Sequence, residues 1–117
     1  MYYKELEVWK EARRLVKEVY KLTSEFPKSE LFGLTSQINR SVISIPSNIA
    51  EGCARYSDKD TNKFIDIALG SAAELDTQLI IAQDLGFAVY DKNLISLVNK
   101  VTAFLQGLKK YINTSGT

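Results

Sequence analysis

Residues 31–52 read LFGLTSQINRSVISIPSNIAEG, and the spacing of the apolar residues in this stretch decides the fold class. Large apolar residues recur at steps of three and four, at Leu31, Leu34, Ile38, Val42, Ile45 and Ile49. This period places them on one face of an α-helix. Pro46 lies inside the stretch and removes one backbone donor, so we expect a kink there.

The same spacing recurs on both sides of this stretch and predicts helices over about 5–26, 30–53, 58–86 and 92–112. Pro27 separates the first two, Ser29 is a candidate N-cap for the second, and Gly86 is a candidate stop for the third. No stretch alternates with period two, so we expect no strand. Because the connections are short, consecutive helices must run antiparallel. The predicted fold is all-α, an antiparallel up-down-up-down four-helix bundle, as a single domain over residues 1–117.

Composition excludes several kinds of site. The chain has 45% hydrophobic and 25% charged residues, the balance of a soluble folded domain. It has no histidine, which removes the imidazole base, the His-paired nucleophile and the His metal ligand. Cys53 is the only cysteine, which excludes an intrachain disulfide, a thiolate zinc site and an iron–sulfur cluster. We therefore expect no enzymatic activity, metal, cofactor or small-molecule substrate.

No segment is typical of membrane insertion or secretion. The longest run without a charged residue is Ser41 to Ala50, ten residues, whereas a membrane-spanning helix needs about twenty. The first residues alternate charged and apolar side chains, unlike a signal peptide. We expect a cytoplasmic protein.

The near-neutral total of +1 conceals an uneven distribution of charge. Residues 1–28 carry +2, residues 57–90 carry −4 and residues 91–117 carry +3. Five cations of the first predicted helix fall within an arc of about 100° and form a basic ridge: Lys10, Arg13, Arg14, Lys17 and Lys21. Such a ridge could follow a phosphate backbone, with Lys109 and Lys110 added if the fourth helix lies alongside. Alternatively, neighbouring glutamates such as Glu7 and Glu11 make it an ordinary solvated face of i,i+3 and i,i+4 ion pairs.

The second predicted helix carries a polar stripe of mostly small residues: Gln37, Arg40, Ser41, Ser44, Ser47, Asn48 and Glu51. Small side chains allow another helix to approach closely. The hairpin near Arg55 would bring Arg40 level with Ser71 to Glu74, so we expect a partly buried Arg40–Glu74 ion pair. Asn48 and Gln78 are candidates for further polar contacts. The predicted inter-helix polar network comprises Arg40, Ser44, Asn48, Glu51, Arg55, Ser71 and Glu74. We favour this structural role over acid–base catalysis by Glu51 and Glu74.

Apolar residues also lie away from the predicted core faces. A bundle of this size can hide one face of each helix, so a second apolar line suggests subunit contact. The candidate contact residues are Phe32, Ile43, Leu69 and Ile80. Coverage by long side chains and loops is the alternative.

Four segments together resemble the 23S ribosomal RNA intervening-sequence protein family. They are LEVWKEA at 6–12, FPKSELFGL at 26–34, RSVISIPSNIAEG at 40–52 followed by Arg55, and FIDIALGSAAEL at 64–75. The resemblance covers roughly residues 5 to 90. Ser41 departs from it, because alanine is common at this position in the family.

The resemblance implies an antiparallel four-helix bundle that assembles as a homopentameric ring. It also implies a bacterial protein, encoded in an insertion of a ribosomal RNA gene or elsewhere in the chromosome. A related branch serves reverse transcriptases of diversity-generating retroelements, where a basic barrel is thought to engage nucleic acid. The resemblance supplies no catalytic residues. The residues that match motif positions, with structural or assembly roles, are Arg40, Ser44, Pro46, Asn48, Glu51, Gly52, Arg55, Gly70, Ser71 and Glu74.

We therefore expect a non-enzymatic oligomer that binds structured RNA or a nucleic-acid–protein complex through its basic ridge. The alternative is a structural or adaptor module that binds only protein, through the acidic helix at 58–86.

Overall fold

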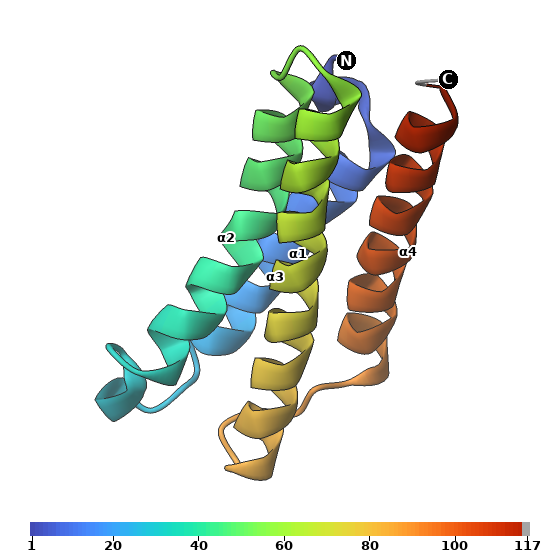
Figure 1. Cartoon of the computed structure of the whole chain (residues 1–117). Coiled ribbons are helices and arrows are strands. Elements are labelled where there is room, and N and C mark those ends of the chain that lie inside the picture. The colour runs from blue at the N-terminus through green and yellow to red at the C-terminus, as the bar shows by residue number, and fades with distance from the viewer. Residues whose placement is uncertain (116–117) are drawn as a thin grey trace.

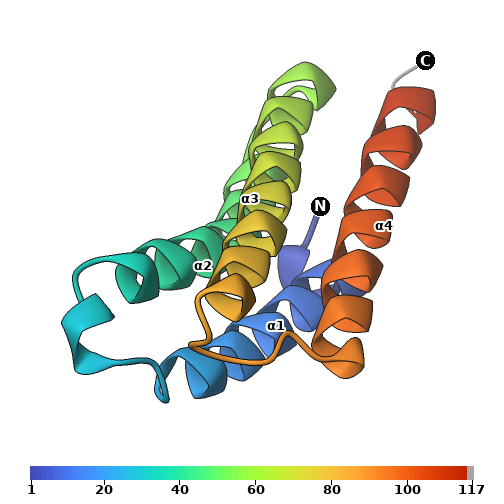
Figure 2. The ribbon, with the colours of Figure 1, turned by 90° about the horizontal axis from the view of Figure 1, so that it is seen from below.

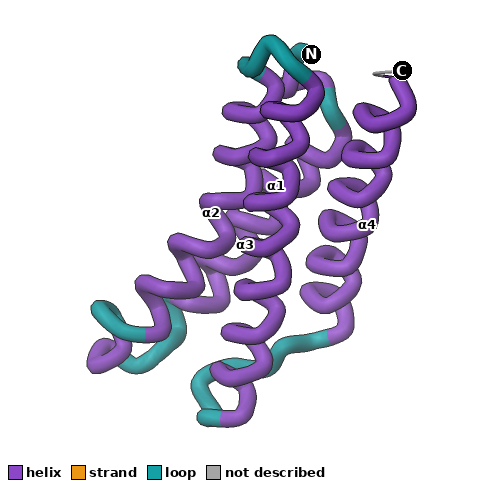
Figure 3. The backbone as a smooth tube through the Cα atoms, viewed as in Figure 1, coloured by secondary structure: helices purple, strands orange, loops and turns teal. Residues whose placement is uncertain are grey.

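The computed structural model describes residues 1–115, which form helices and turns and contain no strand (Figure 3). The elements are the 3₁₀ helix η1 (Tyr3–Glu5), α1 (Glu7–Thr23), the 3₁₀ helix η2 (Lys28–Glu30), α2 (Leu34–Cys53), α3 (Asp58–Asp84) and α4 (Lys92–Ser115). The predicted all-α bundle is confirmed, and Figure 1 shows its four long helices running alternately in opposite directions. Helices α2 and α4 each contact α1 and α3, and the two diagonal pairs do not meet within the described residues.

Most of the core comes from the predicted apolar faces. Fully buried side chains line the inside of every long helix, among them Leu15, Val19, Ile38, Val42, Ile45, Ile49, Ile65, Leu75, Leu79, Val101 and Leu105. Helix α2 continues through Pro46, and its first half leans away from α3 and α4 (Figures 1 and 2). None of the helices in the described part of the chain is both long and apolar enough to cross a membrane.

The connection between α1 and α2 differs from the prediction. The first helix ends at Thr23 rather than 26, and the second begins at Leu34 rather than 30, because η2 and a turn occupy the space between them. The Leu34 N–H donates to Glu30 Oε1 at 3.3 Å, so Glu30 takes the capping role predicted for Ser29. Leu31 therefore precedes α2 instead of joining its core face, and it is 55% exposed.

The other predicted helix ends are close to those observed. Ser57 Oγ accepts the N–H of Asp60 at 3.1 Å and caps α3, and Asp91 Oδ1 accepts the N–H of Leu94 at 2.9 Å at the start of α4. Helix α3 ends at Asp84, and Gly86 follows with a φ of +78°, a conformation that favours glycine. Helix α4 runs three residues past its predicted end at 112.

Tyr90 ties the α3–α4 connection to α3. Its N–H donates to Gln83 Oε1 at 2.9 Å and its hydroxyl donates to Asp76 Oδ1 at 2.7 Å. Burial, together with the hydrogen bond to Asp76, raises the pKa of the Tyr90 phenol above its ordinary value. The neutral phenol therefore holds this connection in place.

Helices α2 and α3 lie close together at Gly52. A Cβ atom at this position would lie 3.0 Å from Phe64 Cβ and 3.1 Å from the carbonyl oxygen of Thr61. The Thr61 hydroxyl donates to the Gly52 carbonyl oxygen at 2.9 Å across the same crossing. The hairpin thus closes over a position where a side chain does not fit.

Two glycine substitutions should change stability in opposite directions. Gly52→Ala forces α2 and α3 apart, and we expect it to lower the free energy of unfolding by roughly 1–3 kcal/mol. Gly70 lies on the exposed side of α3 with nothing near its missing Cβ. Gly70→Ala should therefore raise stability by about 0.5–1 kcal/mol through helix propensity. Denaturant unfolding followed by circular dichroism checks both, and equal effects of the two variants would contradict the close crossing.

Candidate functional site

The basic ridge lies on the outer side of α1, and all five of its side chains are exposed. Three of them pair with a glutamate three residues earlier on the same helix. Lys10 Nζ lies 3.5 Å from Glu7 Oε1, Arg14 Nη1 lies 2.9 Å from Glu11 Oε2, and Lys21 Nζ lies 3.7 Å from Glu18 Oε1. For these three cations the alternative of a salt-bridged solvated face describes the geometry.

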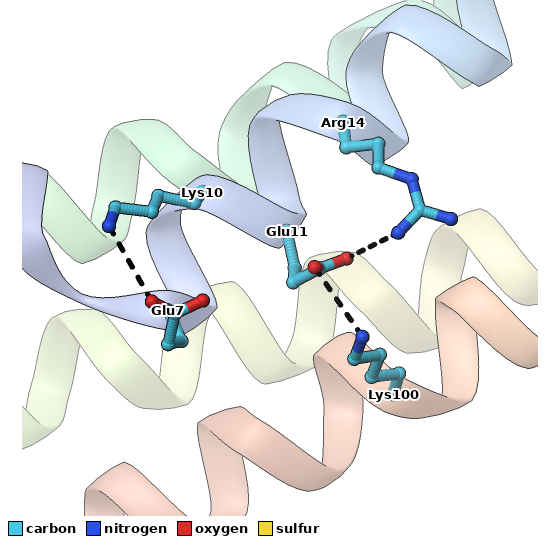
Figure 4. A network of polar contacts seen from close by, with 5 residues as sticks. All are labelled: Glu7, Lys10, Glu11, Arg14 and Lys100. Carbon is cyan, nitrogen blue, oxygen red and sulfur yellow. Dashed lines mark hydrogen bonds and ion pairs between the residues drawn. The ribbon is translucent and has the colours of Figure 1, made fainter.

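Glu11 also joins α1 to α4. Its second carboxylate oxygen, Oε1, lies 3.4 Å from Lys100 Nζ, so one carboxylate accepts cations from two helices (Figure 4). The Glu11 side chain is 16% exposed and is therefore more shielded from solvent than either of its partners. Lys100 was not among the predicted ridge residues, because its place beside α1 depends on the register between the first and last helices.

Arg13 and Lys17 form a second line of the ridge, on the side toward α2. Neither forms an ion pair with any carboxylate of residues 1–115. The Arg13 guanidinium instead stacks over the ring of Trp9, with Cζ 4.9 Å from the ring centroid. These two side chains keep positive charge that the rest of the described chain does not neutralise.

Of the two lysines proposed to extend the ridge from α4, Lys109 is directed away from it. Lys109 Nζ lies 2.6 Å from Asp66 Oδ1, so Lys109 is directed toward α3. Lys110 is exposed and has no carboxylate partner among the described residues. The α4 cation that adjoins the ridge is Lys100.

A groove of about 630 Å³ lies between α1 and α4 beside the ridge. Arg14, Lys21 and Lys100 line it together with Glu18, Glu25 and Asp91. Equal numbers of cations and anions make this groove a poor site for a phosphate. Leu22, Val89, Leu94 and Leu97 supply its apolar surface.

The polar stripe of α2 meets α3 through two sets of hydrogen bonds. Ser44 Oγ lies 2.8 Å from Ser71 Oγ, and Asn48 Nδ2 donates to Ser44 Oγ at 2.9 Å. One turn away, Ser41 Oγ lies 2.8 Å from Glu74 Oε1 and 3.0 Å from Gln78 Oε1. The Ser41 hydroxyl also lies 3.0 Å from the carbonyl oxygen of Gln37, and its one proton goes to one of these three oxygens at a time.

The predicted ion pair between Arg40 and Glu74 does not form. Arg40 is exposed and pairs with no carboxylate of the described residues, while Glu74 Oε1 accepts from Ser41 and, at 3.1 Å, from Gln78 Nε2. The predicted register is right to within one residue. That one residue corresponds to about 100° of rotation, which turns Arg40 out to solvent and Ser41 in toward α3.

We call the hydrogen-bonded contact of Ser41 and Ser44 with α3, together with Asn48, the polar seam. Glu51 and Arg55 lie outside it. They pair with each other at 3.3 Å near the end of α2, where both are exposed. The Arg55 guanidinium lies over the ring of Phe64, with Cζ 4.5 Å from the centroid. Sequence reasoning therefore placed Ser44, Asn48, Ser71, Glu74 and Gln78 in contacts that the structure contains. It listed Ser41 in the polar stripe but left it out of the predicted network.

The geometry of the seam suits the fixing of register more than chemistry. Ser41 is 4% exposed, so a substrate cannot reach its hydroxyl. Across residues 1–115, no group of three or more cysteine, aspartate or glutamate side chains is placed to hold a metal ion. Burial raises the pKa of the Cys53 thiol, which disfavours the nucleophilic thiolate.

Three of the four candidate contact residues remain on the surface. Phe32 is 94% exposed, Ile80 is 45% exposed and Ile43 is 43% exposed, whereas Leu69 packs against the core. Ser41 and Ser44 mark the side of α2 that faces α3, and Ser71 and Glu74 mark the side of α3 that faces α2. Helical geometry then places Ile43 and Ile80 on opposite outer sides of this helix pair. Ile43 and Ile80 therefore lie on two different faces of the molecule.

Comparison with known proteins identifies one family. The family model described as 23S rRNA-intervening sequence protein matches residues 4–110, which include all of α1, α2 and α3 and most of α4. Comparison with curated proteins gives no match. The resemblance seen in the sequence is thus confirmed, and it extends into the fourth helix.

Removing the shared carboxylate should loosen α4. We expect Glu11→Gln to lower the free energy of unfolding by about 0.5–1 kcal/mol, because it leaves Arg14 and Lys100 without an anionic partner. Glu7→Gln removes a single exposed pair and should change stability by less than about 0.3 kcal/mol. Chemical unfolding at low and high salt checks this, because salt should reduce the Glu11 effect. An equal effect of the two variants would contradict the bridging role of Glu11.

Proposed function

We propose that this chain, which belongs to the 23S rRNA-intervening sequence protein family, is a non-enzymatic oligomer that binds structured RNA or a nucleic-acid–protein complex through α1. The observation that carries the proposal is the state of Arg13 and Lys17. Their charges have no carboxylate partner in the described chain, so they are available to phosphate groups. Each phosphate contact would release counterions and add affinity that does not depend on sequence.

Assembly would multiply this small patch. Ile43 and Ile80 lie on two different faces, and contact between different faces of successive subunits generates a ring when the rotation closes. The family resemblance implies five copies. A ring of five would present five pairs of unneutralised cations to one ligand, which raises avidity without any new contact.

The adaptor alternative rests on the acidic α3, and several of its carboxylates have partners within the described residues. Asp66 pairs with Lys109, Asp60 pairs with Lys63, and Asp76 accepts the hydroxyl of Tyr90. Lys63 is already counted in the net charge of −4 and the Tyr90 hydroxyl is neutral, so Lys109 alone lowers this charge, to −3. We favour α1 because Arg13 and Lys17 lie one helical turn apart and neither has a carboxylate partner among the described residues.

Charge reversal at an unpaired and at a paired cation of the ridge should weaken nucleic-acid binding to different extents. Lys17→Glu should weaken binding to structured RNA more than Lys10→Glu, because Glu7 already offsets Lys10. Mobility shifts against structured RNA, duplex DNA and single strands at several salt concentrations provide the measurement. Binding should fall steeply with log salt, and Lys17→Gln should reduce the slope by about one per site. Absence of binding at low salt contradicts the proposal and favours the adaptor.

Mixing two interface variants should reveal how subunits meet. Ile43→Arg and Ile80→Arg should each yield monomers by light scattering, because each destroys one of two complementary faces. An equimolar mixture should form heterodimers, since each variant retains the face that the other lacks. Asn99→Arg, at an exposed polar position of α4, serves as the control and should leave assembly intact. A monomeric wild type at micromolar concentration would contradict assembly, and mixtures that remain monomeric would contradict contact between different faces.

A further inference from the structure

Aromatic rings and cations lie next to one another in the N-terminal part of the molecule. We call this surface the aromatic stripe; it comprises Tyr2, Tyr3, Trp9, Arg13 and Lys17. The ring centroids of Tyr2 and Tyr3 are 6.1 Å apart, and those of Tyr3 and Trp9 are 5.2 Å apart in an edge-to-face arrangement. The stripe is one contiguous surface, because Arg13 stacks on Trp9 and Lys17 follows one helical turn later.

The core holds the inner rings in place and leaves the outer ring accessible. Tyr3 and Trp9 are half-buried and pack against the hydrophobic core, and this packing fixes the orientation of their rings. Tyr2 is 59% exposed, so its ring offers a face to solvent. The exposed Tyr2 ring therefore lies beside two rings whose orientation is already fixed.

The charges around these rings are predominantly positive. Lys4 Nζ lies 6.0 Å from the centroid of the Tyr3 ring, and Arg13 and Lys17 have no carboxylate partner in the described chain. Glu5 is the one carboxylate of η1, and Glu7 is taken up by Lys10. With Lys4 and Glu5 counted, the aromatic stripe keeps a net charge of +2.

We propose that the aromatic stripe binds unpaired nucleobases, so that the preferred ligand is a single-stranded segment of a nucleic acid. This inference rests on the proposed function and names its ligand class. A base can stack on an aromatic ring only when its own face is free, and a duplex hides the faces of its bases. The Tyr2 ring stacks with a base, while Arg13 and Lys17 contact the adjoining phosphates. A patch of lysines alone would not distinguish single strands from duplexes in this way.

Binding of the full-length chain to oligouridine, oligothymidine and an RNA duplex of equal length tests this inference. Trp9 is the only tryptophan, so its fluorescence reports directly on the stripe. We expect both single strands to bind more tightly than the duplex and to change Trp9 emission. Tyr2→Leu should weaken single-strand binding by roughly 5-fold or more while duplex binding stays constant. Tyr2→Phe should bind as the wild type does, because it retains the ring.

Tyr111→Leu is the matched control, because Tyr111 is a similarly exposed tyrosine on α4, 62% exposed. It should leave single-strand binding unchanged. If Tyr2→Leu has no effect, or weakens single strands and duplex equally, the stacking inference is overturned while the charge-based proposed function stands. If no oligonucleotide binds at low salt, both are overturned.

Discussion

The close contact between α2 and α3 is the constraint on which the rest of this bundle depends. Gly52 lets the two backbones approach where a Cβ would collide with Phe64 and Thr61. Further along the pair, the hydroxyls of Ser44 and Ser71 meet directly at 2.8 Å. A hydroxyl left without its partner in such a seam costs about 1–3 kcal/mol, so a slip of the two helices is unfavourable. The pair is thus held in one register, and α1 and α4 pack along it.

Periodicity predicted the four helices because a helix with one buried face has apolar residues at steps of three and four along its sequence. The stop at Gly86 was also readable, since a residue with positive φ is a local requirement of this helix end. The start of α2 was not readable, because Glu30 caps the helix from four residues before Leu34 and a 3₁₀ turn fills the interval. The general positions of helices follow from pattern, whereas their ends depend on which side chain reaches the free N–H groups.

The candidate site could be predicted only in part, for a related reason. A helical wheel gives the direction of a side chain but not its partners, so the five ridge residues looked equivalent. In the structure, glutamates three residues earlier neutralise Lys10, Arg14 and Lys21 and leave Arg13 and Lys17 unpaired. Contacts between segments distant in the sequence were harder still to predict. Arg40 was predicted to contact Glu74, but the register differs by one residue, so Ser41 forms this contact instead.

The bridge at Glu11 has a consequence for the order in which the chain folds. The α1–α2, α2–α3 and α3–α4 contacts join helices that follow one another, whereas Glu11 and Lys100 join the two ends of the chain. Contacts of short sequence separation close early because they cost little loop entropy. The three hairpins can therefore form first, and the α1–α4 contact closes the bundle as the last step. Weakening this bridge should then speed unfolding and leave the folding rate almost unchanged.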